Sequence, residues 1–450
     1  MFIKYPKKID KKIFNSNFEE APLYGLPKDV LFCKSCVISN QRPNSSVEFK
    51  NKKDSKKNTI NFDENLICDA CKVRNKKAEI DWETREKELK ELCDKYRKND
   101  GTYDCLVPGS GGKDSFMQAH LLKYKYGMNP LTCTWAPHIY TDWGWRNHQA
   151  WIHAGFDNIL FTPNGRVHRL LTRLAVDNLL HPFQPFILGQ KNMPVKIAKN
   201  YGISLIFYGE NEAEYGNPLS DMAKAILNKK YLTIDNQDEI VLGGSSLSEL
   251  YEMGLKKGDL EPYFPVSSDL ILENKIQIHY LGYYIKWHPQ KAYYYSVENG
   301  GFESSPERTS GTYSTYVSID DRIEDFNFHT TWIKFGIGRA TYDAAQEIRS
   351  GELTREEGVA LVHKYDGEFP SRWSKQIFDY LTIDKEQFPI ATKFFENPKF
   401  DKEYYDLLCD QFRSPHLWKW DNDKGWVLRY KVSNNKGDQS ETAKFWKGNN

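Results

Sequence analysis

A glycine-rich turn between an apolar run and a helix constrains this chain more than any other feature. Residues 103–108 read Tyr-Asp-Cys-Leu-Val-Pro, which predicts a buried strand, and Gly-Ser-Gly-Gly-Lys-Asp-Ser follows at 109–115. Apolar residues at helical spacing over 116–126, ending at Gly127, predict a helix after the turn. A helix N-terminus presents unpaired N–H groups and the positive end of its dipole, so the turn is suited to hold an anion.

The residue types in this turn favour a phosphate ligand. Two glycines let the backbone approach an anion closely, two serines add hydroxyl donors, and the lysine adds a mobile positive charge. The aspartate either orients a magnesium ion or caps the turn. The spacing differs from the G-x-x-x-x-G-K-[ST] of the P-loop, and the alternative to a phosphate site is a Gly/Ser turn that only caps a helix. The candidate residues are Ser110, Gly111, Gly112, Lys113, Asp114 and Ser115.

Two C-x-x-C pairs precede this turn, Cys33/Cys36 and Cys68/Cys71. Four thiolates on two tight knuckles form the tetrahedral set that structural zinc prefers, which predicts a zinc ribbon. A redox pair and an iron–sulfur cluster are the alternatives. Because half of the eight cysteines fall into these pairs, a reducing compartment is favoured over disulfides, and we expect a cytoplasmic protein.

Apolar runs alternate with helical patterns after the turn. Strands are predicted at 130–135, 158–162 and 204–209, with helices over 145–154, 167–180 and 194–201 between them. This alternation predicts an α/β fold with a parallel sheet, whose ligands lie at the carboxyl ends of the strands. By that rule, we expect one crevice to be faced by residues 110–115, 135–138 and 209–211.

The chain is long enough for several modules. We expect an N-terminal extension (1–30), a zinc-binding module (31–75), a nucleotide-binding domain (76–290) and a C-terminal substrate-binding region of mixed helical and aromatic character (291–450). Within these, the patterns predict a charged helix at 76–98, an exposed lysine-rich loop at 50–58, a polar helical insertion at 213–275 and a strand at 278–287. Helices are predicted at 340–348 and, from a capping box at Thr354 and Glu357, through 362.

Charge and hydropathy exclude several classes. Lys+Arg is 62 and Asp+Glu is 61, a formal net charge of +1, so the basic domain typical of a general nucleic-acid binder is missing. Residues 1–18 alternate lysines with apolar residues, so we do not expect a signal peptide. No run approaches the roughly 20 apolar residues of a membrane span, so no membrane partner is expected.

The turn resembles the PP-loop of ATP pyrophosphatases, which cut ATP between its α and β phosphates. The wider pattern resembles the N-acetyl sugar amidotransferase family, which makes acetamidino sugars for bacterial surface polysaccharides and flagellar sugars. The matching segments span roughly residues 33–430, and the departures, at 1–30 and 50–58, touch no motif. The segments are the four cysteines, Ser-Gly-Gly-Lys-Asp-Ser at 110–115, Gly-Glu-Asn-Glu at 209–212, Tyr-Leu-Gly-Tyr-Tyr at 280–284, Gly-Thr-Tyr at 311–313, Lys-Phe-Gly-Ile-Gly-Arg-Ala-Thr at 334–341 and Tyr-Asp-Gly-Glu-Phe-Pro at 365–370.

The resemblance implies a PP-loop fold of the adenine nucleotide α-hydrolase type, with ATP, Mg²⁺ and structural Zn²⁺. It also implies conversion of an acetamido group of a nucleotide-activated sugar to an acetamidino group through an O-adenylyl imidate, in lipopolysaccharide or flagellar sugar biosynthesis. Residues 110–115 and Gly209 would then bind ATP. Lys113 would stabilise charge on the leaving pyrophosphate from an exposed turn, and Asp114 would serve the loop or its metal.

The nitrogen source and the sugar site are less defined. Because Cys93, Cys105, Cys133 and Cys409 lack a recognisable nucleophile context, the resemblance implies ammonia from a separate glutaminase with a cyclase-like barrel subunit. PP-loop enzymes that modify tRNA, by thiolation or lysidine formation, are the alternative class.

Five further residues are weighed for substrate contacts. Glu210 and Asn211 either contact ligand or cap a helix. Lys334 and Arg339 either grip the phosphates of a nucleotide sugar or lie on a solvated turn, and His138 is a satisfied loop histidine or a base.

Overall fold

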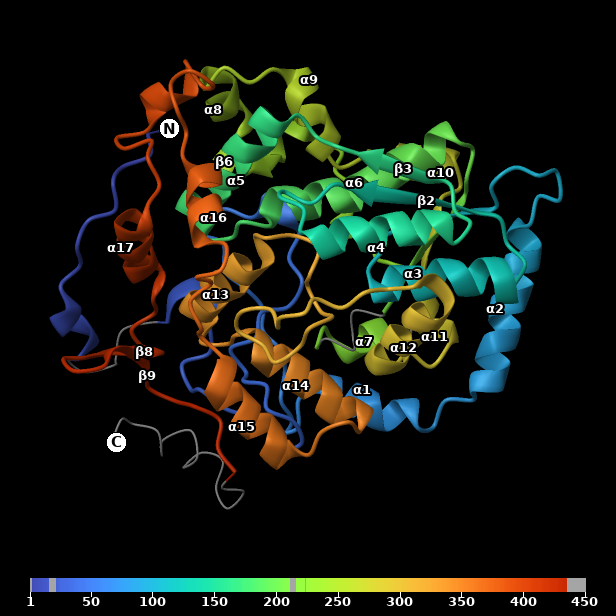
Figure 1. The fold of residues 1–450 in the computed structure, drawn as a ribbon, viewed down its shortest axis with the longest axis horizontal. Helices are drawn as coiled ribbons and strands as arrows, with labels where there is room; N and C mark the ends of the chain where they lie inside the picture. Colours follow the sequence, from blue (N-terminus) through green and yellow to red (C-terminus); the bar gives the residue numbers. More distant parts are fainter. Residues whose placement is uncertain (1, 16–21, 211–215, 223, 435–450) are drawn as a thin grey trace.

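The computed structural model describes residues 2–15, 22–210, 216–222 and 224–434. Its centre is a five-stranded parallel sheet of order β3-β2-β1-β4-β7, of which Figure 1 labels the neighbouring strands β2 and β3. The α/β class predicted from the sequence is therefore confirmed. The strands are β1 (Cys105–Pro108), β2 (Pro130–Trp135), β3 (Asn158–Phe161), β4 (Leu205–Tyr208) and β7 (Gln277–Tyr280).

Successive side chains of β1 point to opposite faces of the sheet. Leu106 pairs with Leu131 on one side and with Ile206 on the other, so β1 is the central strand. The side chains of Cys105 and Val107 enter one core cluster and Leu106 enters another, as the period of two in a strand requires. Helices cover both faces, which explains the nearly continuous apolar character of these strands.

The helices of the sheet domain follow the predicted alternation. They are α3 (Lys113–His120, continued by a π turn at Leu121–Lys125), α4 (Asp142–His153), α5 (Gly165–Leu179) and α6 (Gln184–Asn200). Helix α6 begins ten residues before the predicted start at residue 194. Pro194 lies inside this helix, and a proline at that position in a sequence is typical of a helix start rather than an interior.

Three predicted elements are corrected by the structure. The helix predicted at 76–98 corresponds to α2 (Trp82–Tyr96), which starts where Asp81 caps it by accepting from the N–H groups of Glu83 and Thr84. Residues 76 and 77 instead end a separate, earlier helix, α1 (Asp69–Lys77). The strand at 278–287 ends at residue 280 and turns into α11 (Leu281–Tyr284).

The polar insertion at 213–275 also differs from its prediction, since it holds a β-hairpin as well as short helices. Gly243 and Gly244, both with positive φ, form the turn between β5 (Val241–Leu242) and β6 (Ser245–Ser246). The helices are α7 (Leu219–Met222), α8 (Leu247–Glu252), α9 (Lys257–Leu260) and α10 (Ser268–Glu273).

The C-terminal region is mainly helical. Its elements are α12 (Pro289–Gly300), α13 (Glu324–Phe335), α14 (Arg339–Ser350), α15 (Arg355–Tyr365), α16 (Ser374–Leu381), α17 (Lys402–Phe412) and the hairpin of β8 (Trp418–Asp421) and β9 (Gly425–Leu428). The capping box at Thr354 and Glu357 is confirmed, and it opens α15.

The N-terminal segment packs against this region. Ile3 bridges to Phe395, and the four cysteines share a core cluster with α14 and α15. Figure 1 shows α1, which follows Cys68, beside α14. The domain boundaries drawn from the sequence remain predictions. Among the residues described, none of the helices combines the length and the apolar character needed to cross a membrane.

Candidate active site

A cavity of about 620 Å³ lies where the loop after β1 meets the C-terminal region. The loop supplies one wall, α4 a second, and the segment 316–320 together with α13 and α14 a third. Because α14 is more than two hundred residues from the loop in sequence, the cavity joins two distant parts of the chain. Its polar and charged lining includes Ser110, Lys113, Asp114, Asn147, Gln190, Glu210, Asp320, Glu324, Arg339, Asp343, Gln346 and Glu347.

The loop is shaped by close packing against α4. Gly111 has a φ of +87°, and a Cβ there would lie 2.7 Å from the Cα of His148, so only glycine fits. Gly112 then caps α3, and both Gly112 and Ser110 line the cavity. The sequence prediction of a glycine-rich turn between a strand end and a helix start is confirmed.

Lys113 is buried, not on an exposed turn as the sequence suggested. Only 8% of its surface is accessible, its Nζ lies 2.5 Å from Oδ2 of Asp114, and its carbonyl accepts from the hydroxyl of Ser296 at 2.8 Å. Packing of α12 against α3 covers the lysine. The other carboxylate oxygen of Asp114, Oδ1, is buried and has no hydrogen-bond partner in the described part of the chain. An orphaned carboxylate oxygen at the cavity wall fits a magnesium ligand.

Several predicted site residues lie elsewhere. The Ser115 hydroxyl donates to the carbonyl of Gly112 at 3.0 Å, and the carbonyl of Gly209 accepts from the N–H of Gly282 at 2.9 Å. Neither residue is part of the cavity lining, and neither is Gly111. Glu210 does line the cavity, whereas Asn211 falls outside the described residues.

The expectation that 135–138 faces the same crevice is wrong for both of its aromatic residues. Trp135 packs on Phe161 with ring centroids 5.0 Å apart, inside a core cluster. The Nδ1 of His138 lies 2.7 Å from Oδ2 of Asp321, and the ring is fully buried. His138 is thus held by Asp321 outside the cavity lining, although its buried Nε2 has no hydrogen-bond partner among the described residues.

Lys334 and Arg339, predicted as a pair, are separated. Arg339 lines the cavity and its Nε lies 2.8 Å from Oδ1 of Asp343. Lys334 is buried against a neighbouring cavity, where its ammonium donates to the carbonyl of Leu179 at 2.7 Å. Burial lowers the pKa of Lys334 to about 7. The two residues lie on different helices, α13 and α14, so five positions in sequence do not bring them to one face.

Sequence reasoning missed the acidic wall of the cavity. Arg339, Asp343, Gln346 and Glu347 follow one another at helical spacing, opposite the buried face of Ala344, Ala345 and Ile348. That polar stripe was visible in the sequence. Asp320, in the segment before α13, and Glu324, the first residue of α13, complete the wall.

Burial favours the protonated, neutral form of three carboxyl groups that line the cavity. Burial raises the pKa of the Asp320 carboxyl and, with the Asp320 charge beside it, raises the pKa of Glu324 well above its ordinary value. Burial likewise raises the pKa of Glu347. Carboxyl groups whose pKa is raised accept protons more readily than ordinary exposed carboxylates do.

Motif segments 311–313, 334–341 and 365–370 pack on one another. The carboxylate of Asp366 accepts from the N–H groups of Gly338 at 3.0 Å and Thr341 at 3.1 Å, which fixes the start of α14. The carboxylate of Glu368 accepts from the N–H of Gly311 at 2.8 Å and pairs with Arg308. These segments position the acidic wall, and Arg339 of the segment 334–341 lines the cavity itself.

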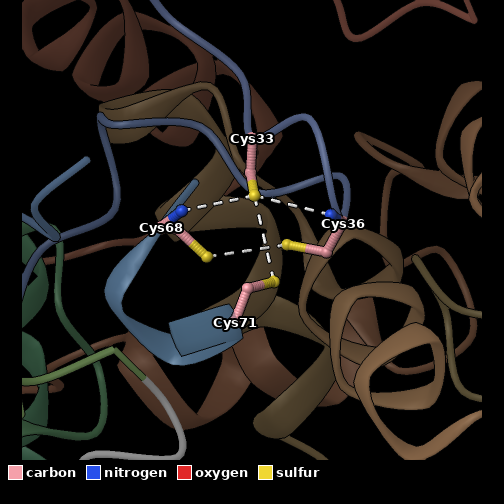
Figure 2. Close-up of side chains that lie close together, drawn as sticks. All are labelled: Cys33, Cys36, Cys68 and Cys71. Atoms are coloured by element: carbon pink, nitrogen blue, oxygen red, sulfur yellow. Dashed lines mark hydrogen bonds between the residues drawn. The ribbon is translucent and has the colours of Figure 1, made fainter. Parts of the chain in front are cut away.

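The four predicted cysteines form one buried cluster near the N-terminus (Figure 2). The Sγ atoms of Cys33 and Cys71 are 3.9 Å apart, and those of Cys36 and Cys68 are 3.8 Å apart. A tetrahedral ion with Zn–S bonds of about 2.3 Å requires Sγ separations of about 3.8 Å. All four are free cysteines, so the set fits structural zinc in donor type and geometry.

Two arginines connect this cluster to α14, which carries part of the acidic wall, and to the next helix, α15. Arg349, at the end of α14, lies 4.0 Å from the Sγ of Cys36. Arg355, at the start of α15, donates to the carbonyl oxygens of Cys33 and Cys36. The zinc module therefore supports the far end of the helix that carries Arg339, Asp343 and Glu347.

Comparison with known proteins concerns mainly the C-terminal region. Residues 310–433 match the family described as "LPS biosynthesis protein WbpG-like, C-terminal domain". This match supports an enzyme family of lipopolysaccharide or sugar biosynthesis. It covers the segment 316–320, α13 and α14, which form the acidic wall.

A second similarity covers 75 residues. The chain is 37% identical over this stretch to MJ1599, an uncharacterized protein of Methanocaldococcus jannaschii. The stretch is 17% of this chain and 27% of the archaeal protein, so the chain spans about a quarter of that relative's length.

Proposed function

We propose that this chain is a PP-loop amidotransferase that uses ATP to convert the acetamido group of a nucleotide-activated sugar to an acetamidino group. One observation carries the proposal. Residues of the phosphate-type loop (Ser110, Gly112, Lys113 and Asp114) and of the WbpG-like segment line a single cavity. A nucleotide and a sugar substrate can therefore meet there.

ATP would lie with its phosphates on the loop. The N–H groups at the start of α3, the hydroxyl of Ser110 and the ammonium of Lys113 are the donors available to it. Asp114 would hold Mg²⁺ through Oδ1, and the bound ion would supply charge neutralisation at the phosphates. The positive charges of Lys113 and of the bound Mg²⁺ would also offset the repulsion between the phosphates of ATP and the carboxylates of the acidic wall.

The chemistry requires activation of a poor leaving group. The acetamido oxygen attacks the α-phosphorus, the bond to the β-phosphate oxygen breaks, and pyrophosphate leaves. Ammonia then attacks the imidate carbon, the bond to the adenylyl oxygen breaks, and AMP leaves with the former acetamido oxygen. Lys113 would stabilise the charge that develops on pyrophosphate in the first step.

The acidic wall would serve the second step. Carboxylates attract ammonium, and the attacking ammonia must lose one proton to give a neutral amidine. Glu324 and Asp320, whose pKa values are raised, are suited to accept that proton. The sequence alone had assigned no residue to this role.

Ammonia would come from a separate glutaminase subunit. Apart from the cluster, the described cysteines are buried, and burial raises the pKa of Cys93 and of Cys409 to about 12. Burial raises the pKa of Cys105 and Cys133 as well. Such thiols are poor nucleophiles, which supports an external source.

The test is incubation of the pure chain with ATP, Mg²⁺, ammonium and a panel of nucleotide-activated N-acetyl sugars. Mass spectrometry should show exchange of O for NH in one sugar, with AMP and pyrophosphate formed only when that sugar is present. Glutamine in place of ammonium should give no product. ADP as the main product, or turnover with glutamine alone, would contradict the proposal.

A further inference from the structure

A chain of basic cavities leads away from the acidic one. A second cavity of about 380 Å³ shares Gln190 with the first. A third, of about 540 Å³, shares part of its wall with the second. We call the second and third cavities together the basic trough. The residues shared between its two parts are Asn44, Ser45, Ser46, Asn51 and Lys57.

The charge of the lining reverses along this path. Glu210, Asp320, Glu324, Asp343 and other carboxyl groups line the first cavity. The second has Glu48 among its basic residues, and no acidic residue occurs in the described lining of the third. The lysines of the third cavity are Lys50, Lys56, Lys57, Lys224 and Lys230. The lysine-rich loop at 50–58, which touches no motif, thus supplies three of them.

Lys57 is the best-defined cation of the trough. Its ammonium donates to the hydroxyl of Ser46 at 2.9 Å and to Oδ1 of Asn51 at 3.0 Å. An ammonium has three N–H donors, so one is left for a ligand. Asn51 is itself buried, and its side-chain amide donates a hydrogen bond to the carboxylate of Glu48 at 3.1 Å. The position of the Lys57 ammonium is therefore fixed before a ligand binds.

The shape of the substrate connects the two environments. If the acetamido group reacts beside the loop, the diphosphate of the same nucleotide-activated sugar lies a sugar ring or more away. A second polyanion beside ATP and the acidic wall would be repelled, whereas the trough offers lysines and adjoins the first cavity at Gln190, which lines both. We infer that the basic trough binds the diphosphate and nucleoside of the sugar substrate, an inference that rests on the proposed function.

The test is direct binding of uridine diphosphate to the full chain by calorimetry, without turnover. Lys57→Gln combined with Lys230→Gln should weaken binding about tenfold or more, since charge-assisted hydrogen bonds contribute about 1.5–3 kcal/mol each. Glutamine at position 57 can still donate to Ser46 and Asn51, so the fold should persist. Lys87→Gln, an exposed lysine on α2, is the matched control and should leave binding unchanged.

Competing ligands and kinetics complete the test. Mg-ATP affinity should not change in the double variant, and in turnover the KM for the sugar nucleotide should rise while the KM for ATP stays constant. Unchanged uridine diphosphate binding in the double variant would overturn the inference. So would tighter binding of farnesyl diphosphate or of an RNA oligonucleotide at the same lysines. Binding of uridine diphosphate that depends on these lysines, without formation of any amidino product, would support the trough as a nucleotide-binding site and refute the proposed function.

Discussion

The ammonium of Lys113 lies 2.5 Å from Oδ2 of Asp114, while Oδ1 of the same carboxylate is buried without a hydrogen-bond partner among the described residues. One oxygen of the carboxylate thus neutralises the lysine and the other is left to a cation. The pair is organised at the N-terminus of α3, where anion binding is intrinsically favoured. A loop that only capped the helix would need neither the Lys113–Asp114 ion pair nor a buried carboxylate oxygen without a partner.

Replacing Lys113 with alanine should lower the rate by about 10²–10³, the cost of removing one electrostatic donor to a developing charge. Lys113→Arg should rescue poorly, because a planar guanidinium does not replace a compact ammonium in a buried site. Zinc content should be unchanged in both variants. Steady-state rates with saturating ATP check this. Near-full activity of Lys113→Ala would show that the loop is only a helix cap.

Replacing Glu324 with glutamine should remove the acidic limb of the pH–rate profile. The pKa of Glu324 is raised by burial and by Asp320, so the rate in the native chain should fall as pH drops through that raised value. The profile must be measured at constant free ammonia, because ammonium also titrates. Glu303→Gln, an exposed carboxylate outside the cavity lining, is the control. An unchanged acidic limb in Glu324→Gln would assign the proton to another group.

Replacing Cys68 with serine should lower zinc content and solubility, because a structural zinc site contributes directly to folding. Loss of the cluster should also lower activity, since Arg349 and Arg355 tie it to α14 and α15. Cys409→Ser, a buried cysteine outside the cluster, should keep its zinc. Metal analysis of anaerobically purified protein provides the measurement. An iron–sulfur absorption band, or no metal at all, would refute the zinc assignment.

His416 should make the fold sensitive to acid. It accepts from Ser414 and donates to Gln41 as a neutral ring, and burial lowers its pKa to about 4 from an ordinary value near 6.5. Stability from this group is complete above about pH 6.5 and is lost as pH falls toward 4, at most about 3 kcal/mol. His416→Gln should flatten that dependence in urea unfolding, and exposed His153→Gln should not. Equal slopes in all three proteins would contradict the assignment.

Local sequence signals predicted the sheet well and the site in part. The strand at 130–135 and the turn at 109–115 are strongly encoded, because a buried parallel strand is apolar throughout and a helix start has its own residue types. Two helix starts were predicted at the wrong residue. Helix α6 was expected to begin at Pro194, which lies inside it, and the charged helix was expected to begin at residue 76, before the cap at Asp81. Tertiary packing decides whether a proline or a capping residue starts a helix, so the local sequence does not show it.

The acidic wall could not be placed from sequence alone, although its polar stripe was present. Asp320 and Glu324 reach the loop only because α13, α14 and the zinc module are packed together, a relationship between residues more than two hundred positions apart. Lys334 shows the reverse case. Arg339, five residues further along the chain, lines the first cavity. Because a turn between α13 and α14 separates the two residues, Lys334 lines the second cavity instead.

The path of the acetamido oxygen tests the central claim most directly. A nucleotide-activated sugar carrying a heavy oxygen isotope in its acetamido group should be incubated with the chain, Mg-ATP and ammonium. If the oxygen attacks the α-phosphorus, the label must appear in AMP, with none in pyrophosphate or water. Label retained in the sugar, or released to water without entering AMP, would contradict the proposed reaction.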